Sequence, residues 1–130
     1  DVAPSRGLGD VYKRQTDSMG WITENETGKH TLTEIEPLDA LDAWHRYHDK
    51  VKYVMMSWSP DGIPVDWQLL QEMRKTNPDV ELICIGEKLG SSGSKTFWNH
   101  ATYVDPEATE ELNKHFSHFD LVHDQLYIVQ

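Results

Sequence analysis

The residue types best suited to binding or chemistry follow an apolar run near the middle of the chain. Tyr53 to Met56 are strand formers in a run too short for a helix, and Ser57, Trp58, Ser59 and Pro60 come directly after them. Such a run predicts a strand buried on both faces, as in a parallel sheet. Open α/β sheets bind ligands at the carboxyl ends of their strands. The hydroxyls and the indole therefore mark a candidate site.

A second polar group follows the next apolar run. Leu82 to Ile85 predict another buried strand, which ends at Glu87 and is followed by a loop that contains Gly90 and Ser91. The carboxyl ends of parallel strands share one edge of a sheet, so these three residues are candidate substrate contacts beside the first group. Each has a plainer interpretation. Glu87 can be a solvated loop carboxylate, the loop a simple connector, and Trp58 a core or rim residue rather than a stacking platform.

The surrounding elements alternate between strand and helix patterns. Strands are expected over 30–36, 51–58 and 81–87, and helices over 38–47, 64–76 and 106–115. Two further extended stretches, 116–121 and 124–129, are expected to pair as an antiparallel hairpin. This rhythm predicts an α/β protein with a Rossmann-like, mostly parallel sheet flanked by helices. In the helix over 64–76, Val65, Leu69, Leu70 and Met73 are expected to face inward.

The length and net charge of the chain limit the number of domains and the kinds of partner that we expect. The chain has 130 residues, room for one domain at most, and a formal net charge of -10. This charge argues against nucleic acid as a partner, because phosphate neutralisation needs clustered Lys and Arg. The single cysteine, Cys84, lies in an apolar run and is expected to be a buried thiol. No apolar run has membrane-spanning length and no signal peptide is visible, so a cytoplasmic location is expected.

The first fifteen residues differ from the rest of the chain. They show no clear periodicity, and they resemble a tract often found at the start of translated sequence assemblies, where adaptor sequence is read as protein. We therefore expect residues 1–15 to be a non-native leader and residues 16–130 to form the domain.

The order of these motifs resembles the carboxyl-terminal half of class I S-adenosylmethionine-dependent methyltransferases. It is similar to a methyltransferase-like, Rossmann-type group in which a Ser-Trp-Pro-Pro strand end precedes an Ile-Gly-Glu strand end and a Gly-rich loop; this chain has Ser57 to Pro60 and Ile85 to Glu87. The resemblance implies S-adenosylmethionine as cofactor, with Asp39 and Ala40 at its adenine. It also implies that Ser57, Trp58, Ser59 and Pro60 shape the site of the acceptor, whose identity stays open.

The chain departs from this pattern in two ways. The Gly-rich loop after the first strand and the acidic strand end for the ribose are absent, so the resemblance implies a truncated domain whose amino-terminal strands are missing. Ser59 stands where the pattern has its first proline, and the motif does not begin with Asp or Asn. Both features leave an inactive Rossmann-like binding or interaction domain as an alternative.

The histidines suggest a third hypothesis, a small metal-dependent hydrolase. His45 and His48 lie three residues apart on a predicted helix, and a second group lies near the carboxyl terminus: His115, His118, Asp120, His123 and Asp124. No HExxH or paired-cysteine motif supports such a site. No metal ligand is therefore assigned.

Overall fold

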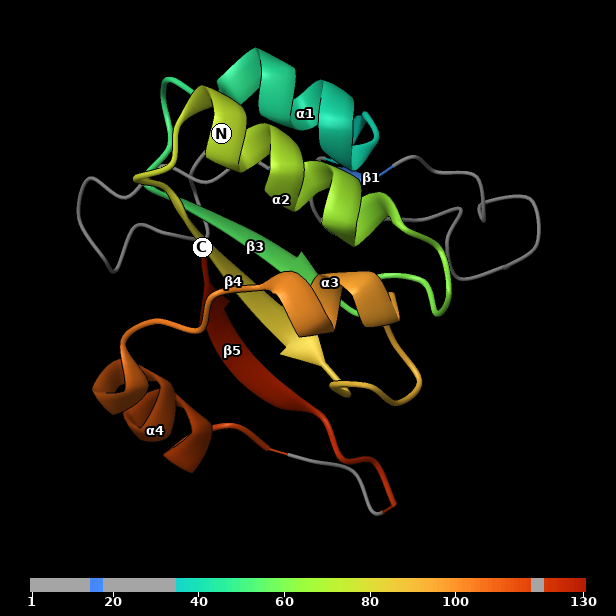
Figure 1. Cartoon of the computed structure of the whole chain (residues 1–130), viewed down its shortest axis with the longest axis vertical. Helices are drawn as coiled ribbons and strands as arrows, with labels where there is room; N and C mark the ends of the chain where they lie inside the picture. Colours follow the sequence, from blue (N-terminus) through green and yellow to red (C-terminus); the bar gives the residue numbers. More distant parts are fainter. Residues whose placement is uncertain (1–14, 18–34, 118–120) are drawn as a thin grey trace. The chain divides into compact units, whose positions relative to one another are not determined.

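The computed structural model describes residues 15–17, 35–117 and 121–130. The chain divides into two compact units, residues 1–43 and 44–130. Helix α1 (Ala40–Tyr47) begins in the first unit and ends in the second. Figure 1 shows the course of the chain.

The described part of the first unit is a short parallel pair of strands followed by the start of α1. Strand β1 (Thr16–Asp17) pairs with β2 (Glu36–Pro37), and the Glu36 N–H donates to the Gln15 carbonyl at 3.1 Å. The expected leader, 1–15, lies outside the described residues except for Gln15, which takes part in this pairing. The strand expected over 30–36 is described only at its end, where β2 extends one residue further, to Pro37.

The second unit is built on a mixed sheet of three strands. Strand β3 (Tyr53–Ser57) runs parallel to β4 (Glu81–Gly86), and β5 (Gln125–Val129) is antiparallel to β4 on its other side. Helix α2 (Val65–Thr76) connects the two parallel strands. The α/β class predicted from the alternation of patterns is therefore confirmed, with β3, α2 and β4 as its βαβ unit.

Local sequence explains where the helices begin and end. Leu69, Leu70 and Met73 of α2 are buried as expected, and Val65 is half-buried. The helix ends at Thr76, two residues before Pro78. Helix α4 (Pro106–Lys114) starts at an Asp105 cap, whose Oδ1 accepts from the Ala108 N–H at 3.2 Å. Helix α3 (Lys95–His100) was not predicted. It is only six residues long, and it starts where the Ser94 side chain accepts from the Phe97 N–H.

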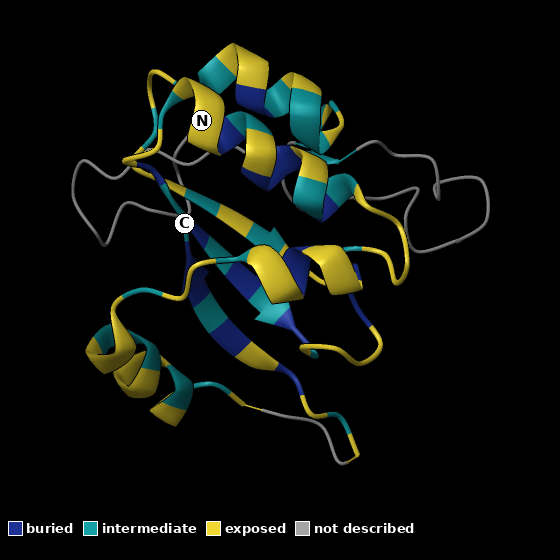
Figure 2. Ribbon diagram, in the orientation of Figure 1, coloured by how far each residue is buried: buried dark blue, intermediate teal, exposed yellow. Residues whose placement is uncertain are grey.

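One face of the sheet carries the core of this unit. Alternation along the strands and their register place Leu82, Cys84 and Val129 on that face, and all three are buried. Cys84 is 2% exposed, which confirms the expected buried thiol. Figure 2 shows the contrast between the buried residues of β4 and β5 and the exposed residues of β3.

Strand β3 is not buried on both faces, so that prediction was wrong. Every second residue is exposed, with Tyr53 at 60% and Met55 at 65%. The apolar run does predict the strand, but burial on its second face needs a covering element, and β3 is the last strand of its sheet. A local pattern cannot show whether such an element is present.

The predicted hairpin of 116–121 with 124–129 is also wrong for the residues that can be checked. Phe116 and Ser117 are in no strand, and 118–120 lie outside the described residues. The outer edge of β5 instead meets residues 102–104: the Thr102 and Gln130 N–H groups donate to each other's carbonyls, and the Val104 N–H donates to the Ile128 carbonyl. Further along, the Asn113 amide donates to the Leu126 carbonyl and accepts from its N–H, both at 2.9 Å. The Asn113 side chain of helix α4 thus makes the hydrogen bonds that a neighbouring strand would otherwise make.

None of the helices in the described ranges combines the length and the apolar composition that a transmembrane span requires.

Candidate ligand edge of the sheet

The turn after β3 holds a tryptophan in an unusual backbone conformation. Trp58 has φ 49°, in the left-handed region, and its N–H donates to the Ile85 carbonyl at 2.7 Å. For an L-residue with a bulky side chain this conformation costs about 1–2 kcal/mol. The side chain is nevertheless 40% exposed. Its surroundings therefore hold a strained residue at the carboxyl end of a parallel strand, with part of its indole open to solvent.

Backbone hydrogen bonds join this turn to the loop after β4. The Gly93 N–H donates to the Ser59 carbonyl at 2.9 Å, and the Gly62 N–H donates to the Gly93 carbonyl at 3.0 Å. The two loops at the carboxyl edge are thus held together as one surface. The structure therefore brings the predicted residues Ser57, Trp58, Ser59 and Pro60 beside the loop that carries the other predicted group.

The buried carboxylate of Asp66 holds the loop after β4 in place. Asp66, in the first turn of α2, is fully buried, and its Oδ2 accepts from the Ser94 N–H at 2.8 Å. Its Oδ1 accepts from the Ser94 hydroxyl and from the Trp67 N–H, both at 2.8 Å. Burying a carboxylate is costly unless hydrogen bonds replace its water. These three donors supply that replacement and tie the loop after β4 to α2.

The loop is closely packed around Gly93. A Cβ on this residue would lie 2.7 Å from Asp66 Oδ2 and 2.8 Å from Trp98 Nε1, and its φ is 72°. The Trp98 Nε1–H donates to the Ser92 carbonyl at 2.9 Å, and the Ser92 hydroxyl oxygen accepts from the Glu87 N–H at 2.9 Å. Much of the loop's hydrogen-bonding capacity is therefore used internally, and the loop has a defined shape.

The predicted substrate contacts lie on the outer side of this loop. Glu87 is half-buried, and its Oε2 accepts from the His123 N–H at 3.0 Å. The Gly90 N–H donates to the Glu87 carbonyl, and Gly90 and Ser91 are both exposed. These residues stand beside the Trp58 turn, on the same edge of the sheet.

Asp39 and Ala40 belong to the first unit, whereas the other predicted site residues belong to the second. The Asp39 Oδ1 accepts from the Asp42 N–H at 2.8 Å, so Asp39 caps α1. Ala40 is the first residue of that helix.

Sequence reasoning missed the residues that support the edge: Asp66, Ser92, Ser94 and Trp98. One of them had a visible signal. Asp66 precedes Leu69, Leu70 and Met73 by three, four and seven residues, so a helical wheel puts the carboxylate on the apolar face of α2. A carboxylate at such a position is buried and must find donors. The partners in 92–98 had no comparable signal, because they come from a loop distant in sequence.

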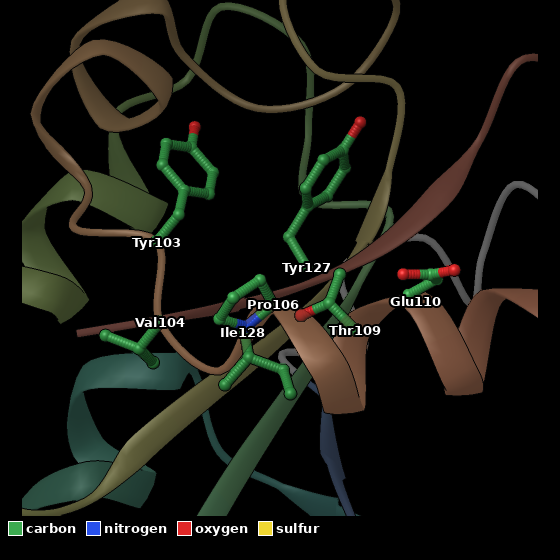
Figure 3. A pocket seen from close by; sticks show the side chains of 7 residues that line it. All are labelled: Tyr103, Val104, Pro106, Thr109, Glu110, Tyr127 and Ile128. Carbon is green, nitrogen blue, oxygen red and sulfur yellow. The ribbon is translucent and has the colours of Figure 1, made fainter.

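A hollow lies beside β5. It has a volume of about 360 Å³ and is lined by Tyr103, Val104, Pro106, Thr109, Glu110, Tyr127 and Ile128. Figure 3 shows the two phenol rings side by side with their hydroxyls pointing the same way, and their centroids are 6.0 Å apart. The Lys88 Nζ lies 4.0 Å from the centroid of the Tyr103 ring, a cation–π contact. The Lys88 ammonium group therefore already contacts the Tyr103 ring that lines the hollow.

The phenols of this hollow predict a loss of stability at high pH. Burial first, and then the negative charges of Tyr127 and Cys84, raise the pKa of Tyr103 to about 12, and burial also raises the pKa of Tyr127. The unfolded chain releases the Tyr103 proton near its usual pKa of 10. The folded chain holds it until about pH 12, so this stabilisation is present below pH 10 and is lost as the pH rises through 12.

Urea titrations at pH 8, 10 and 11 measure this loss. We expect the free energy of unfolding to fall from pH 10 to pH 11, and Tyr103→Phe to make the fall smaller. Tyr53→Phe, at a tyrosine that is 60% exposed, serves as the control and should leave the pH dependence unchanged. A free energy of unfolding that stays constant from pH 8 to pH 11 would contradict the prediction.

The described residues do not assemble a metal site. Within 15–17, 35–117 and 121–130, no group of three or more His, Cys, Asp or Glu side chains is arranged to hold an ion. The Nε2 of His45 lies 3.8 Å from Glu72 Oε1, and that of His115 lies 3.5 Å from Glu111 Oε1. His118 and Asp120 of the proposed cluster lie outside the described residues. The hydrolase hypothesis thus has no ligand set in that part of the chain.

Three comparisons with known proteins bear on the identity of the chain. No family model, no curated protein and no solved structure matches it.

Proposed function

We propose that this chain is the distal part of a methyltransferase-like domain, and that the carboxyl edge of β3 and β4 is its acceptor side. Trp58 is the observation that carries the proposal. Backbone strain of this kind persists only where the surroundings enforce it, and it concentrates at ligand and active sites. Here the strain holds a partly exposed indole over the edge where α/β sheets bind ligands.

The residues of this edge suit a planar acceptor that carries a hydrogen-bonding group. The Trp58 indole offers a ring for stacking, and the neighbouring Ser57 and Ser59 offer hydroxyl groups for hydrogen bonds. Pro60 restricts the turn, and Glu87, Gly90 and Ser91 border it from the adjoining loop. Because the two loops are bonded to each other and the loop after β4 is bonded to Asp66, the surface is formed before a ligand arrives. Such preorganisation lowers the cost of orienting a substrate.

The proposed cofactor is S-adenosylmethionine, which supplies an already activated methyl group. The chain's task is then to align the acceptor nitrogen and to exclude water. Asp39 is the proposed contact to the adenine amino group, with Ala40 beside it. The Asp39 Oδ1 serves the cap of α1, and in the described part of the chain its Oδ2 has no hydrogen bond. A carboxylate oxygen with spare acceptor capacity fits an amino group.

A non-catalytic binding domain is the second candidate. It is favoured by Ser59, which stands where the methyltransferase-like pattern has its first proline. Stacking and backbone contacts alone suffice for recognition.

Calorimetric titrations test both candidates. The probes are S-adenosylhomocysteine and 4-aminoquinoline, a planar heteroaromatic amine, added to the chain and to its Trp58→Gly and Trp58→Phe variants. Stacking on an aromatic side chain contributes about 1–3 kcal/mol. Trp58→Gly should therefore weaken 4-aminoquinoline binding at least about fivefold, whereas Trp58→Phe, which keeps a ring, should weaken it less. S-Adenosylhomocysteine binding should be unaffected by either variant.

Each other outcome has a definite meaning. Because the chain lacks the Gly-rich loop and the acidic strand end, the methyltransferase assignment predicts only weak binding of S-adenosylhomocysteine. Binding of 4-aminoquinoline with no binding of S-adenosylhomocysteine at all favours the non-catalytic domain. A folded chain that binds neither probe contradicts the proposed function altogether. Equal binding of 4-aminoquinoline by the parent chain and by Trp58→Gly shows that the edge does not carry the ligand.

A further inference from the structure

Among the described residues, none bonds to the backbone groups on the outer edge of β3. The Trp58 N–H donates to the Ile85 carbonyl, so Val54 and Met56, which share its alternation, direct their backbone groups toward β4. Tyr53, Met55 and Ser57 then direct their N–H and C=O groups away from the sheet. Across the described ranges no strand pairs with β3 on that side.

The opposite edge of the sheet, along β5, differs because its outward backbone groups are hydrogen-bonded. The outward backbone groups of Leu126 and Gln130 are bonded to Asn113 and Thr102. No residue in the described ranges covers the edge of β3 in this way. The strand also lacks the charges, prolines and bulges that usually protect edge strands, from Tyr53 through Ser57.

The side chains beside this edge are apolar and open to solvent. Tyr53 is 60% exposed and Met55 is 65% exposed, on the same face of the strand. A strand added at this edge would satisfy the backbone groups and would cover part of both side chains. The edge is therefore suited to a strand that is itself apolar and uncharged.

The flanks of β3 indicate which strand that is. Lys50 and Lys52 outnumber Asp49 before the strand, and Asp61 follows it, so the two flanks carry opposite net charges. In an antiparallel pair of identical strands, the positive flank of each copy lies near the negative flank of the other. The same strand in a second copy of the chain thus matches this edge in polarity and in charge.

We infer that β3 binds β3 of a second copy in antiparallel fashion, around a two-fold axis at Met55. Only the outward residues can form ladder bonds, and among the registers they allow this one pairs all three: Tyr53 with Ser57, Met55 with Met55, and Ser57 with Tyr53. The exposed methionines then cover each other across the axis. The contact is self-complementary, as in a closed two-fold dimer. It rests on the strand edge alone and does not depend on the proposed function.

Cysteine cross-linking tests the register. Met55→Cys places two thiols across the axis with a Cα–Cα separation of about 5.5 Å, which lies within the range that disulfides accept. We expect this variant to form a covalent dimer at least tenfold faster than Leu112→Cys, which replaces a residue that is 43% exposed on α4. The native Cys84 does not interfere, because it is 2% exposed. Equal cross-linking rates for the two variants would overturn the register.

Sedimentation equilibrium tests the association without any cross-link. The parent chain should show a monomer–dimer equilibrium, and Met55→Lys, which sets two like charges across the axis, should raise its dissociation constant at least tenfold. Leu112→Lys should leave that constant unchanged. A parent chain that stays monomeric at every concentration, including one whose edge is covered by another segment of the same chain, would overturn the inference. So would a dimer that Met55→Lys does not weaken.

Discussion

Replacing Asp66 by alanine is expected to lower the free energy of unfolding by about 3 kcal/mol. The carboxylate is fully buried and accepts from three donors, which are the Ser94 N–H, the Ser94 hydroxyl and the Trp67 N–H. Removing it leaves buried donors without acceptors, and this costs more than a lost surface contact. Urea denaturation followed by tryptophan fluorescence measures the change.

A matched control and a double-mutant cycle make this prediction specific. Asp61→Ala removes an exposed carboxylate from the turn after β3 and should change stability by less than about 0.5 kcal/mol. Ser94→Ala, combined with Asp66→Ala, should show a coupling energy of about 1–3 kcal/mol, because the two residues share their hydrogen bonds. If Asp66→Ala costs no more than Asp61→Ala, then Asp66 is not the anchor of the loop.

Replacing Trp98 by alanine is expected to cost about 4 kcal/mol. Trp98 is 3% exposed and packs edge-on against Phe97 and Tyr127, with ring centroids 5.0 and 5.3 Å away. The variant leaves a large cavity and also removes the donor to the Ser92 carbonyl. Trp98→Phe should cost less, because a ring still fills part of the space while the carbonyl loses its donor.

Trp58 is also a tryptophan, but its replacement should cost much less stability than that of Trp98. It is 40% exposed and has a positive φ, so Trp58→Gly relieves backbone strain while it removes modest packing. We expect its stability to stay within about 1 kcal/mol of the parent chain. Similar losses for Trp98→Ala and Trp58→Gly in urea denaturation would show that Trp58 is a core residue, and would remove the main support for a ligand role.

The parts of the fold that local sequence determines were predictable. Helix α2 is marked by its apolar spacing and by its end before Pro78, and α4 by Asp105 followed by Pro106. The strands β3 and β4 are marked by their apolar runs. The α/β class follows from these elements because a helix joins two neighbouring strands.

What could not be predicted depends on contacts between distant residues. The exposure of Met55 depends on which elements cover β3, and a five-residue run cannot reveal them; among the described strands β3 has a neighbour on one side only. The hairpin prediction failed because residues 102–104 and the Asn113 side chain occupy the edge of β5. The candidate residues at the two strand ends were predicted from their position after apolar runs. The hydrogen bonds and packing by which Asp66 and Trp98 hold the loop after β4 could not be predicted, because these side chains meet their partners only in the folded chain.

The most direct test of the ligand edge is an amide-resolved NMR titration of the chain with 4-aminoquinoline. We expect the largest shift changes at the Trp58 indole N–H and at the backbone amides of 57–62 and 87–93, with small changes around Tyr103 and Tyr127. A footprint centred on the hollow beside β5, or saturable binding that leaves the Trp58 indole unmoved, would contradict the assignment of the ligand site to the carboxyl edge of β3 and β4.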